Sequence, residues 1–439
     1  MKAVSRERFS LGSSISSVPA SWTNPDENAY SGFRTCNVRD GSPVKILVLG
    51  GAGAMARATV RDLLTAKDVD AVGVADLSLE GAKAFVAGFR SDRAKALHID
   101  VRDGESLRRL VKQWDVVVNE TWYELNLDVM SAAIAAGVHY VDLGGLYHMT
   151  LKQLTRHRAA ADAGVTCLLG MGATPGTMNL MASYGASRLD RIERVRLASG
   201  SVTVSSESSE GFVVPYSIRT ILDEVSFPAP VFRNGRIEFV PPLTEKEVFQ
   251  FPEPVGRVEG YRTIHSELAT LPEHLGKGLK EMDFTIVFPP DLASALATLA
   301  RLGLVSRDPL RIGEREVIPY HVVAAAVDRL PKPKGPTLDV DMQRCEITGI
   351  RRGERVVVTY DSIAKPNLKW QIDGGTVSTG TPASIAAQWI ARGKITARGV
   401  VPPEVAVEPL AFFRELGAKG RTIEVWERDT EERLLSGNR

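Results

Sequence analysis

The feature that most constrains this chain is a glycine-rich turn between a short apolar run and a stretch with helical spacing. Residues 44–49 are almost entirely apolar, and they lead into Gly50-Gly51-Ala52-Gly53-Ala54-Met55-Ala56. Helical spacing then continues to residue 66. A glycine-rich turn in this setting favours a strand, a tight loop and a helix in that order.

The turn also fits the pattern G-x-G-x-x-G/A at Gly51, Gly53 and Ala56. The first glycine allows the tight turn, the second lets the backbone approach a pyrophosphate, and the small third residue lets helix and strand pack closely. The helix N-terminus offers N–H groups and a partial positive charge to phosphates. The alternative is a glycine-rich turn that binds nothing. We expect a dinucleotide here, held by Gly51, Gly53, Ala54 and Met55.

Asp76 favours one form of the dinucleotide. It follows a second apolar run, about 20 residues after the glycines, where an acidic residue can accept hydrogen bonds from the adenosine ribose. A carboxylate there would repel a 2′-phosphate, and Leu77 and Ser78 supply no arginine to hold one. We therefore expect NAD rather than NADP. The other interpretation of Asp76 is a helix cap.

Short apolar runs alternate with helical stretches up to about residue 173. This order is typical of a Rossmann-type, doubly wound parallel sheet, so the predicted fold class is α/β. The expected strands are residues 44–49, 71–74, 96–99, 115–118, 138–143 and 165–169, and the expected helices are 54–66, 79–89, 104–113, 125–136 and 148–163.

The alternation of short apolar runs and helical stretches ends at about residue 174. Runs at 191–204 and 236–240, and a hairpin formed by 338–350 and 355–360, indicate an α+β domain with a mixed or antiparallel sheet. Residues 1–42 have no period and many turn formers, so we expect a flexible extension, with a transit peptide as the alternative. The expected units are 1–42, an NAD-binding domain at 43–173, a substrate domain at 174–375, and a C-terminal segment at 376–439.

Composition excludes several classes of protein. The chain has 54 Lys and Arg against 53 Asp and Glu, so its net charge of +1 predicts no nucleic-acid or acidic-membrane partner. No apolar run is long enough for a membrane helix. Three widely spaced cysteines without a C-x-x-C pair favour a cytoplasmic protein without disulfides. Because no H-x-x-x-H pair occurs either, we expect no structural metal.

Polar residues follow three of the expected strands, where the ligand crevice of a parallel sheet lies. The segments are Asn119-Glu120-Thr121-Trp122-Tyr123, Asp142-Leu143-Gly144-Gly145 and Gly172-Ala173-Thr174-Pro175-Gly176. We expect Asn119, Glu120 and Gly144 beside the coenzyme, and Trp122, Tyr123 and Thr174 beside the substrate. Asp142 has two interpretations: a group that faces the substrate, or a loop carboxylate that holds local N–H groups.

His265 is the first candidate acid/base, because it lies in a polar stretch of the substrate domain and can exchange a proton near neutral pH. A structural histidine bonded to backbone is the alternative. Glu267 and Tyr147 are further candidates for the same role. Arg219 and Arg262 are candidates to bind a substrate carboxylate through a guanidinium fork.

The motifs Gly51-Ala52-Gly53, His139-Tyr140-Val141-Asp142-Leu143-Gly144-Gly145 and Thr174-Pro175-Gly176-Thr177-Met178-Asn179 resemble those of the saccharopine dehydrogenase family. The resemblance covers about residues 44–425. It implies an NAD(P)-dependent oxidoreductase that acts on a C–N bond of an amino acid, a homodimer or higher homo-oligomer, and a C-terminal segment that returns to the Rossmann domain. Asp142 could then anchor the substrate amine. Bulky Trp122 and charged Glu120 depart from the small or apolar residues of relatives and put the substrate in doubt.

Within the family, residues 185–190, 251–256 and 270–273 are most similar to the lysine 6-dehydrogenases. This implies oxidative deamination of the ε-amine of L-lysine to the semialdehyde, with release of ammonia. The first alternative is a saccharopine or carboxynorspermidine dehydrogenase, which forms or cleaves a secondary amine. The second is a non-catalytic NAD-binding sensor. A substrate with several carboxylates would need more arginines in the cleft, so their number there separates these hypotheses.

Overall fold

The computed structural model describes residues 43–204, 214–330, 338–418, 420–429 and 432–436. The chain divides into two units, residues 1–36 and 37–439, and every described residue belongs to the second. The predicted extension at 1–42 therefore lies outside the described residues. Within them, no helix is both long enough and apolar enough to cross a membrane.

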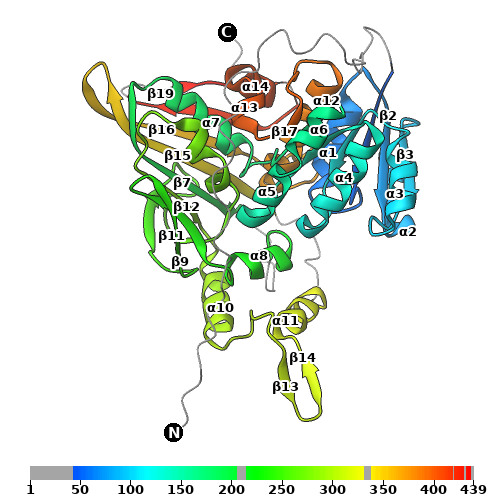
Figure 1. Cartoon of the computed structure of the whole chain (residues 1–439), viewed down its shortest axis with the longest axis horizontal. Helices are drawn as coiled ribbons and strands as arrows, with labels where there is room; N and C mark the ends of the chain where they lie inside the picture. The colour runs from blue at the N-terminus through cyan, green and yellow to red at the C-terminus, as the bar shows by residue number, and fades with distance from the viewer. Residues whose placement is uncertain (1–42, 205–213, 331–337, 419, 430–431, 437–439) are drawn as a thin grey trace. The chain divides into compact units, whose positions relative to one another are not determined.

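The first half of the chain and one C-terminal strand form a seven-stranded parallel sheet in the order β17-β6-β5-β4-β1-β2-β3, which confirms the predicted α/β fold class (Figure 1). Its strands are β1 Val44–Leu49, β2 Val69–Asp76, β3 Ala94–His98, β4 Val116–Asn119, β5 His139–Asp142, β6 Thr166–Leu168 and β17 Gly399–Val401. Its helices are α1 Ala56–Thr65, α2 Leu79–Ala87, α3 Gly104–Val111, α4 Asn126–Ala136, α5 Leu146–Leu154 and α6 His157–Asp162. The single helix expected at 148–163 is thus two.

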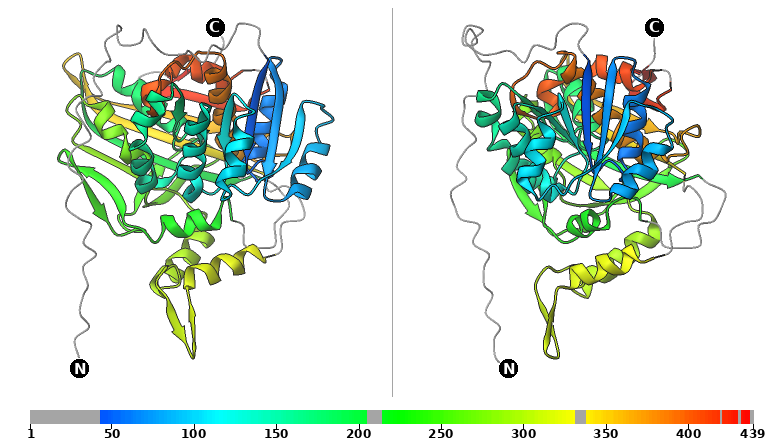
Figure 2. Two further views of the ribbon diagram at one scale, coloured as in Figure 1. Left: turned by 45° about the vertical axis from the view of Figure 1, so that its right-hand side comes forward. Right: turned by 90° about the vertical axis from the view of Figure 1, so that its right-hand side faces the viewer.

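Helices cover both faces of this sheet (Figure 2). Alternate residues of β1 point to opposite faces, so Ile46 and Val48 pack with α1 while Leu47 and Leu49 pack with α3 and α4. All four side chains are fully buried. Burial on both faces explains why these strands read as nearly continuous apolar runs.

The second sheet has ten strands and is mixed, as the sequence predicted. Its main path is β10-β11-β12-β7-β15-β16-β18-β19, with β8 and β9 attached beside β12. The bounds are β7 Arg191–Thr203, β8 Ala229–Arg233, β9 Arg236–Val240, β10 Glu247–Gln250, β11 Arg257–Arg262, β12 Glu281–Ile286, β15 Asp339–Arg351, β16 Glu354–Ala364, β18 Ile423–Arg428 and β19 Glu432–Leu434. Of these pairings, β12 with β7 is parallel, and the predicted hairpin is β15–β16.

Helices and short elements complete the second half of the chain. A small hairpin of β13 Leu310–Ile312 and β14 Arg315–Val317 extends away from the two sheets (Figure 1). The helices are α7 Thr177–Ser187, α8 Ile218–Glu224, α9 Leu271–Leu275, α10 Pro290–Arg301, α11 Pro319–Asp328, α12 Gly374–Ala391, α13 Pro403–Ala406 and α14 Pro409–Leu416, with 3₁₀ turns η2 Tyr123–Leu125 and η3 Glu267–Ala269.

The C-terminal segment packs on the parallel sheet. Strand β17 pairs with β6 and so adds a seventh strand. Helix α12 crosses α1 so closely that a Cβ on Gly380 would lie 2.6 Å from the carbonyl oxygen of Met55. One apolar core therefore joins both halves of the chain. The domain boundaries at 173 and 375 stay predictions.

Candidate active site

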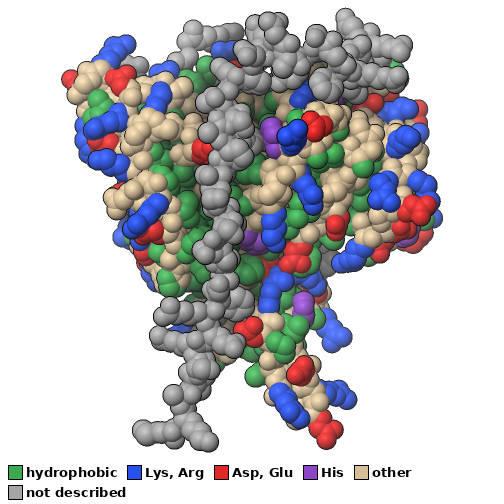
Figure 3. All heavy atoms as spheres, viewed as in Figure 1, with side chains coloured by type: hydrophobic (Ala, Val, Ile, Leu, Met, Phe, Trp, Pro, Cys, Tyr) green, Lys and Arg blue, Asp and Glu red, His purple; other side chains and the backbone are tan. Residues whose placement is uncertain are grey.

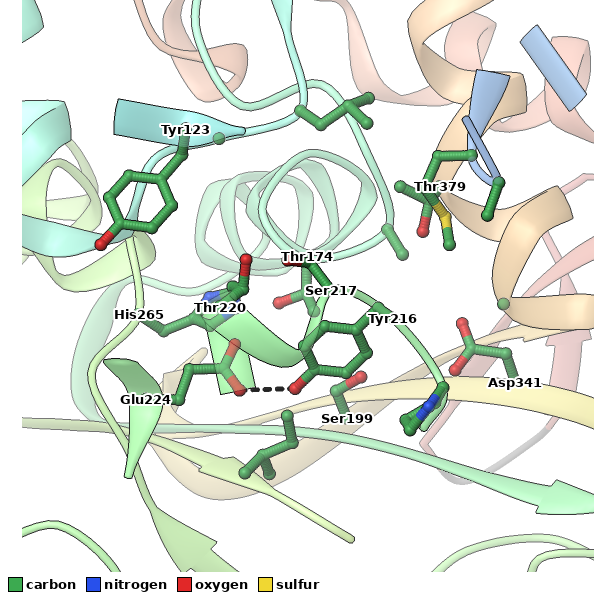
Figure 4. A pocket seen from close by; sticks show the side chains of 18 of the residues that line it. Tyr123, Thr174, Ser199, Tyr216, Ser217, Thr220, Glu224, His265, Asp341 and Thr379 are labelled. Atoms are coloured by element: carbon green, nitrogen blue, oxygen red, sulfur yellow. Dashed lines mark hydrogen bonds between the residues drawn. The ribbon is translucent and has the colours of Figure 1, made fainter. Parts of the chain in front are cut away.

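A cavity of about 590 Å³ lies where the carboxyl ends of the parallel strands face the second sheet. Residues from both halves of the chain line it, and among those labelled in Figure 4, Tyr123 and Thr174 precede α7 in the chain while Tyr216 and Glu224 follow β7. A position outside the carboxyl ends of parallel strands is where ligands bind in open α/β sheets.

The glycine loop has the close backbone contacts that its pattern predicted. Gly50 has φ of +69°, and a Cβ there would lie 2.6 Å from the carbonyl oxygen of Glu120. A Cβ on Gly51 would lie 2.9 Å from the Val48 carbonyl oxygen, and one on Gly53 would lie 2.9 Å from that of Gly50.

The loop leads directly into the start of α1. Helix α1 begins at Ala56 without a side-chain cap, and Gly53, Ala54 and Met55 line the cavity. The N–H groups of Arg57 and Ala58 bond to the Ala54 and Met55 carbonyl oxygens, so a ligand at this helix start would meet the N–H groups that precede them. A side chain at Gly50, Gly51 or Gly53 would clash with the loop's own backbone. The loop as it stands fits the pyrophosphate of NAD(P).

Asp76 ends β2 and fastens the glycine loop. Its Oδ2 accepts a hydrogen bond from the Ala52 N–H at 3.2 Å, and its Oδ1 accepts one from the Ser78 N–H at 3.0 Å. The cap of α2 is Ser78, whose hydroxyl accepts from the Gly81 N–H. Asp76 therefore does not cap the helix, and its expected role toward the ribose stays a prediction.

Of the two residues at the end of β4 that were expected beside the coenzyme, Glu120 lines the cavity and Asn119 does not. Asn119 is buried behind the loop, where its Nδ2 donates to Asn126 Oδ1 at 2.9 Å and to the Tyr140 hydroxyl at 3.3 Å. Glu120 lines the cavity and accepts a hydrogen bond from the Thr59 hydroxyl. Burial raises the pKa of Glu120 to about 8, against the lowering effect of Thr59, so this carboxyl is mostly protonated at neutral pH.

Asp142 is a loop carboxylate, which is the second of its two interpretations. It is fully buried and is not among the residues that line the cavity. It accepts hydrogen bonds from the N–H groups of Gly144 at 2.9 Å and Gly170 at 2.6 Å, from the Tyr140 hydroxyl and from Gln153. It thereby holds Gly144, which does line the cavity and has φ of +110°.

His265 and Thr174 meet at buried Glu267, a contact that the sequence analysis did not anticipate. His265 Nδ1 lies 2.5 Å from Glu267 Oε2, and the Thr174 hydroxyl donates to Glu267 Oε1. The imidazole stacks on Phe284 at 4.0 Å, and both His265 and Thr174 line the cavity. Burial lowers the pKa of His265, but the charges of Glu267 and Glu224 raise it by more, so the pKa lies above its ordinary value.

Glu224 is a site residue that sequence reasoning missed. It ends α8, is 2% exposed, and accepts a hydrogen bond from the Tyr216 hydroxyl at 2.5 Å (Figure 4). Burial raises its pKa to about 7, against the charge of His265 and the hydrogen bond of Tyr216. No local signal marks it, because a single glutamate in a short helix is commonplace.

Asp339 and Asp341 at the start of β15 were also missed. Asp341 accepts hydrogen bonds from Ser378 at 2.5 Å and Gln343 at 2.6 Å, and Asp339 accepts one from the Gly375 N–H at 3.0 Å. Burial raises the pKa of Asp339 to about 7 and that of Asp341 to about 6. The spacing i, i+2 places both on one face of a strand, and this was the available signal.

Besides Asn119, Asp142 and Glu267, three more expected residues do not line the cavity, which corrects their predicted roles. Arg219 pairs with Asp328 at 3.1 Å near the surface, because it projects from a different face of α8 than Glu224 does. Arg262 is buried in the second sheet and pairs with Glu247 at 2.7 Å. Tyr147 packs its ring against Phe239, and burial raises its pKa.

Carboxyl groups outnumber basic side chains at the cavity, where His265 is the basic group among the described lining residues. Among the described residues that line it, the carboxyls are Glu120, Glu224, Asp339 and Asp341, and none is a lysine or arginine. The molecular surface differs, since basic and acidic side chains are interspersed on the face in Figure 3. The acidic character therefore belongs to the cavity rather than to the whole protein.

The chain resembles known proteins in sequence and in fold. It is 25% identical over 347 residues to a carboxynorspermidine synthase of Vibrio alginolyticus, covering 74% of this chain and 81% of that one. It is 20% identical over 391 residues to a carboxyaminopropylagmatine dehydrogenase of Synechocystis sp., covering 86% and 96%. The structure of apo saccharopine dehydrogenase (L-Glu forming) from Saccharomyces cerevisiae has a TM-score of 0.69 at 16% identity, covering 88% of this chain and 99% of that one.

Family models account for both halves of the molecule. Residues 46–168 match the saccharopine dehydrogenase NADP binding domain, and residues 172–421 match the saccharopine dehydrogenase C-terminal domain. The first match contains the glycine loop and Asp76, and the second contains Glu224, His265 and Asp341. The chain is therefore a member of the saccharopine dehydrogenase family, a dehydrogenase that uses NAD(P) and acts on amine-bearing substrates.

Proposed function

We propose that this enzyme forms or cleaves a secondary amine in a polyamine-like substrate that carries more ammonium groups than carboxylates. The observation that carries the proposal is the carboxyl-rich lining of the cavity, with Glu224, Asp339 and Asp341 and no lysine or arginine among the described lining residues. Buried carboxyls of this kind ionise more readily beside a cation. A cationic amine therefore gains more from this cavity than an acidic substrate does.

This proposal ranks the hypotheses drawn from the sequence. Saccharopine carries three carboxylates, and binding them would call for guanidinium groups that the cavity lining lacks. L-Lysine carries one carboxylate beside two ammonium groups, so the lining ranks it above saccharopine but not below a polyamine-like substrate. The names of two relatives, carboxynorspermidine synthase and carboxyaminopropylagmatine dehydrogenase, agree with an amine-rich substrate. A single carboxylate can be held by hydroxyls such as those of Ser199 and Ser217.

The side chains of the cavity suit proton transfer at the reacting nitrogen. Bound NAD(P) would accept or supply the hydride at the carbon next to that nitrogen. The nitrogen must first lose a proton, because only a free lone pair can form the C=N bond. His265 is held by Glu267 at Nδ1, which leaves Nε2 for the substrate. Glu224 lines the same cavity and can hold a second proton or the charge of the amine.

The coenzyme preference and the assembly state are part of the proposal. Asp76 and the absence of an adjacent arginine support NAD, whereas the matching family model describes NADP binding. Both coenzymes are therefore compared in the test. We also propose a homodimer, which light scattering of the purified chain would measure.

The test follows NAD(P)H absorbance at 340 nm with carboxynorspermidine, carboxyaminopropylagmatine, saccharopine and L-lysine, each with NAD and with NADP. We expect turnover of one of the first two, and a KM that rises at least about tenfold in Asp341→Asn, equivalent to 1.4 kcal/mol of binding. Exposed Glu80→Gln is the matched control. Turnover of saccharopine or L-lysine alone would overturn the proposal. Tight coenzyme binding without turnover would favour the sensor hypothesis.

A further inference from the structure

Arg307 joins segments from both halves of the chain at one edge of the cavity. It lies between α10 and β13, and its Nε and Nη2 donate to Asp223 Oδ1 at 3.2 and 2.7 Å. Its Nη2 also pairs with Glu124 Oε1 at 3.0 Å. Asp223 belongs to α8, while Glu124 belongs to the turn that follows β4 of the parallel sheet. One guanidinium therefore bridges helix α8 and the turn η2, which come from different halves of the chain.

Asp223 completes the bridge with its second oxygen. Asp223 Oδ2 accepts a hydrogen bond from the Tyr123 hydroxyl at 2.7 Å, and the Tyr320 hydroxyl lies 3.4 Å away. The Asp223 side chain is fully buried. A buried carboxylate without its cation is strongly destabilised, so Arg307 and Tyr123 depend on each other through it.

Three aromatic rings surround the Arg307 guanidinium. Its carbon lies 4.2 Å from the ring centroid of Tyr320, and 5.9 Å from those of Trp122 and Phe227. A flat cation beside ring faces gains cation–π attraction while its N–H groups stay in plane for carboxylates. The position of Arg307 is thus set by three separate segments.

The residues next to this bridge line the cavity. Trp122 and Tyr123 line it from the parallel-sheet side, and Thr220 and Glu224 line it from α8, with Glu224 directly after Asp223. In Figure 4 the Tyr123 hydroxyl points away from Tyr216 and Asp341, and it is the group that donates to Asp223. A shift of the bridge would therefore change the distance between two walls of the site.

We propose that Arg307 is a positioning residue, which sets the spacing of Trp122 and Glu224 across the cavity by tying Asp223 to Glu124 and Tyr123. It does not touch the reacting atoms. Because the spacing of reacting groups strongly affects rate, loss of the bridge would lower kcat while leaving the coenzyme loop intact. The inference rests on the proposed function only for the choice of substrate in the kinetic measurement.

The first measurement is hydrogen–deuterium exchange of coenzyme-free Arg307→Ala, Arg307→Lys and Tyr123→Phe. We expect faster exchange at 121–126 and 218–225 together, and most in Arg307→Ala. The second segment contains Asp223, and the first contains Tyr123, which donates to it. Arg307→Lys keeps the positive charge and guards against a variant that fails to fold. Exposed Arg329→Ala, at the end of α11, is the matched control. Unchanged exchange in either segment, or faster exchange throughout the chain, would overturn the proposal.

The second measurement is kinetic. We expect kcat for the amine substrate to fall about ten- to hundredfold in Arg307→Ala, with Arg307→Lys intermediate and the Kd for NAD(P)H unchanged. A lower melting temperature with unchanged kcat would mean a structural role only and would contradict the proposal. If no amine is turned over by the parent enzyme, the proposed function fails while the exchange result still decides the role of Arg307.

Discussion

At the scale of single residues, burial and neighbouring charges give this site its chemistry. Glu120 and Glu224 have pKa values of about 8 and about 7, because burial disfavours their ionised forms. His265 has a raised pKa because the charges of Glu267 and Glu224 outweigh the effect of its burial. Groups that titrate near neutral pH are suited to accept and return the proton of an amine.

Replacing Glu267 with glutamine should move the pH dependence of the reaction. Without the charge of Glu267, burial lowers the pKa of His265, so neutral His265 persists to lower pH. We expect the acidic limb of kcat/KM for amine oxidation to shift to lower pH in Glu267→Gln, and His265→Asn to lose about 10²–10⁴ in rate. Exposed Glu273→Gln is the control. An acidic limb that stays in place would contradict the role of His265.

At the scale of elements, close backbone contacts hold the glycine loop in place. The glycine loop leaves no room for a Cβ at Gly50, Gly51 or Gly53. Helix α12 leaves none at Gly380, where it crosses α1 beside Met55. Helix α12, from the C-terminal part of the chain, therefore supports the glycine loop. A change in the packing of α12 or α1 should alter the position of this loop.

Gly53→Ala should weaken coenzyme binding without unfolding the protein. The added Cβ would lie 2.9 Å from the Gly50 carbonyl oxygen, so the loop must shift at the position expected for the pyrophosphate. We expect the Kd for NAD(P)H, measured by fluorescence titration, to rise at least about tenfold. Gly104→Ala, whose Cβ would meet only Arg108 at 3.8 Å, is the matched control. An unchanged Kd would mean that the coenzyme does not approach this loop.

Gly380→Ala should affect both stability and coenzyme binding. The new methyl group would lie 2.6 Å from the Met55 carbonyl oxygen and 2.9 Å from Ala58 Cβ, which forces α12 away from α1. Overpacking of this kind costs about 1–3 kcal/mol of the free energy of unfolding. Urea denaturation and the Kd for NAD(P)H measure the two effects. A stability loss with unchanged coenzyme affinity would show that α12 supports the core but not the loop.

At the scale of the whole molecule, buried acids make stability depend on pH. Glu120, Glu224 and Asp339 have folded-state pKa values above their ordinary ones, so between about pH 4.5 and 8 the folded state binds protons that the unfolded chain has released. Stability then falls as pH rises. His139 and His148, whose pKa values burial lowers to about 4, act oppositely, but only below about pH 6.5.

The free energy of unfolding of the coenzyme-free enzyme should therefore fall between pH 6.5 and 8. The slope is up to about 1.4 kcal/mol per pH unit for each proton released. Glu120→Gln should flatten the part of the curve around pH 8, because it removes the group with the highest of these pKa values. Urea denaturation at several pH values measures both curves. Identical slopes for the two proteins would contradict the protonated state of Glu120.

The coenzyme loop and the parallel sheet could be predicted from the sequence because their causes are local. The residues next to the glycines in the sequence reveal a tight turn that has no room for a Cβ. A strand buried on both faces appears in the sequence as an apolar run. His265 and Glu267 were both singled out as acid/base candidates in one polar segment, but their pairing was not predicted. Asp339 and Asp341 left a weaker signal, two carboxyls at a strand period.

The family, the fold class and the glycine loop could all be predicted from the sequence, because steric and hydrophobic patterns act over short distances along the chain. Which charged residues meet depends on how distant segments pack together. The tertiary structure brought Glu224 and Asp341 to one cavity from positions 117 residues apart, and it removed Arg219 and Arg262 from that cavity. It also placed Arg307 against Asp223. Charged side chains of ordinary appearance acquire a role only when folding buries them together, because burial and mutual distance set their pKa values and partners.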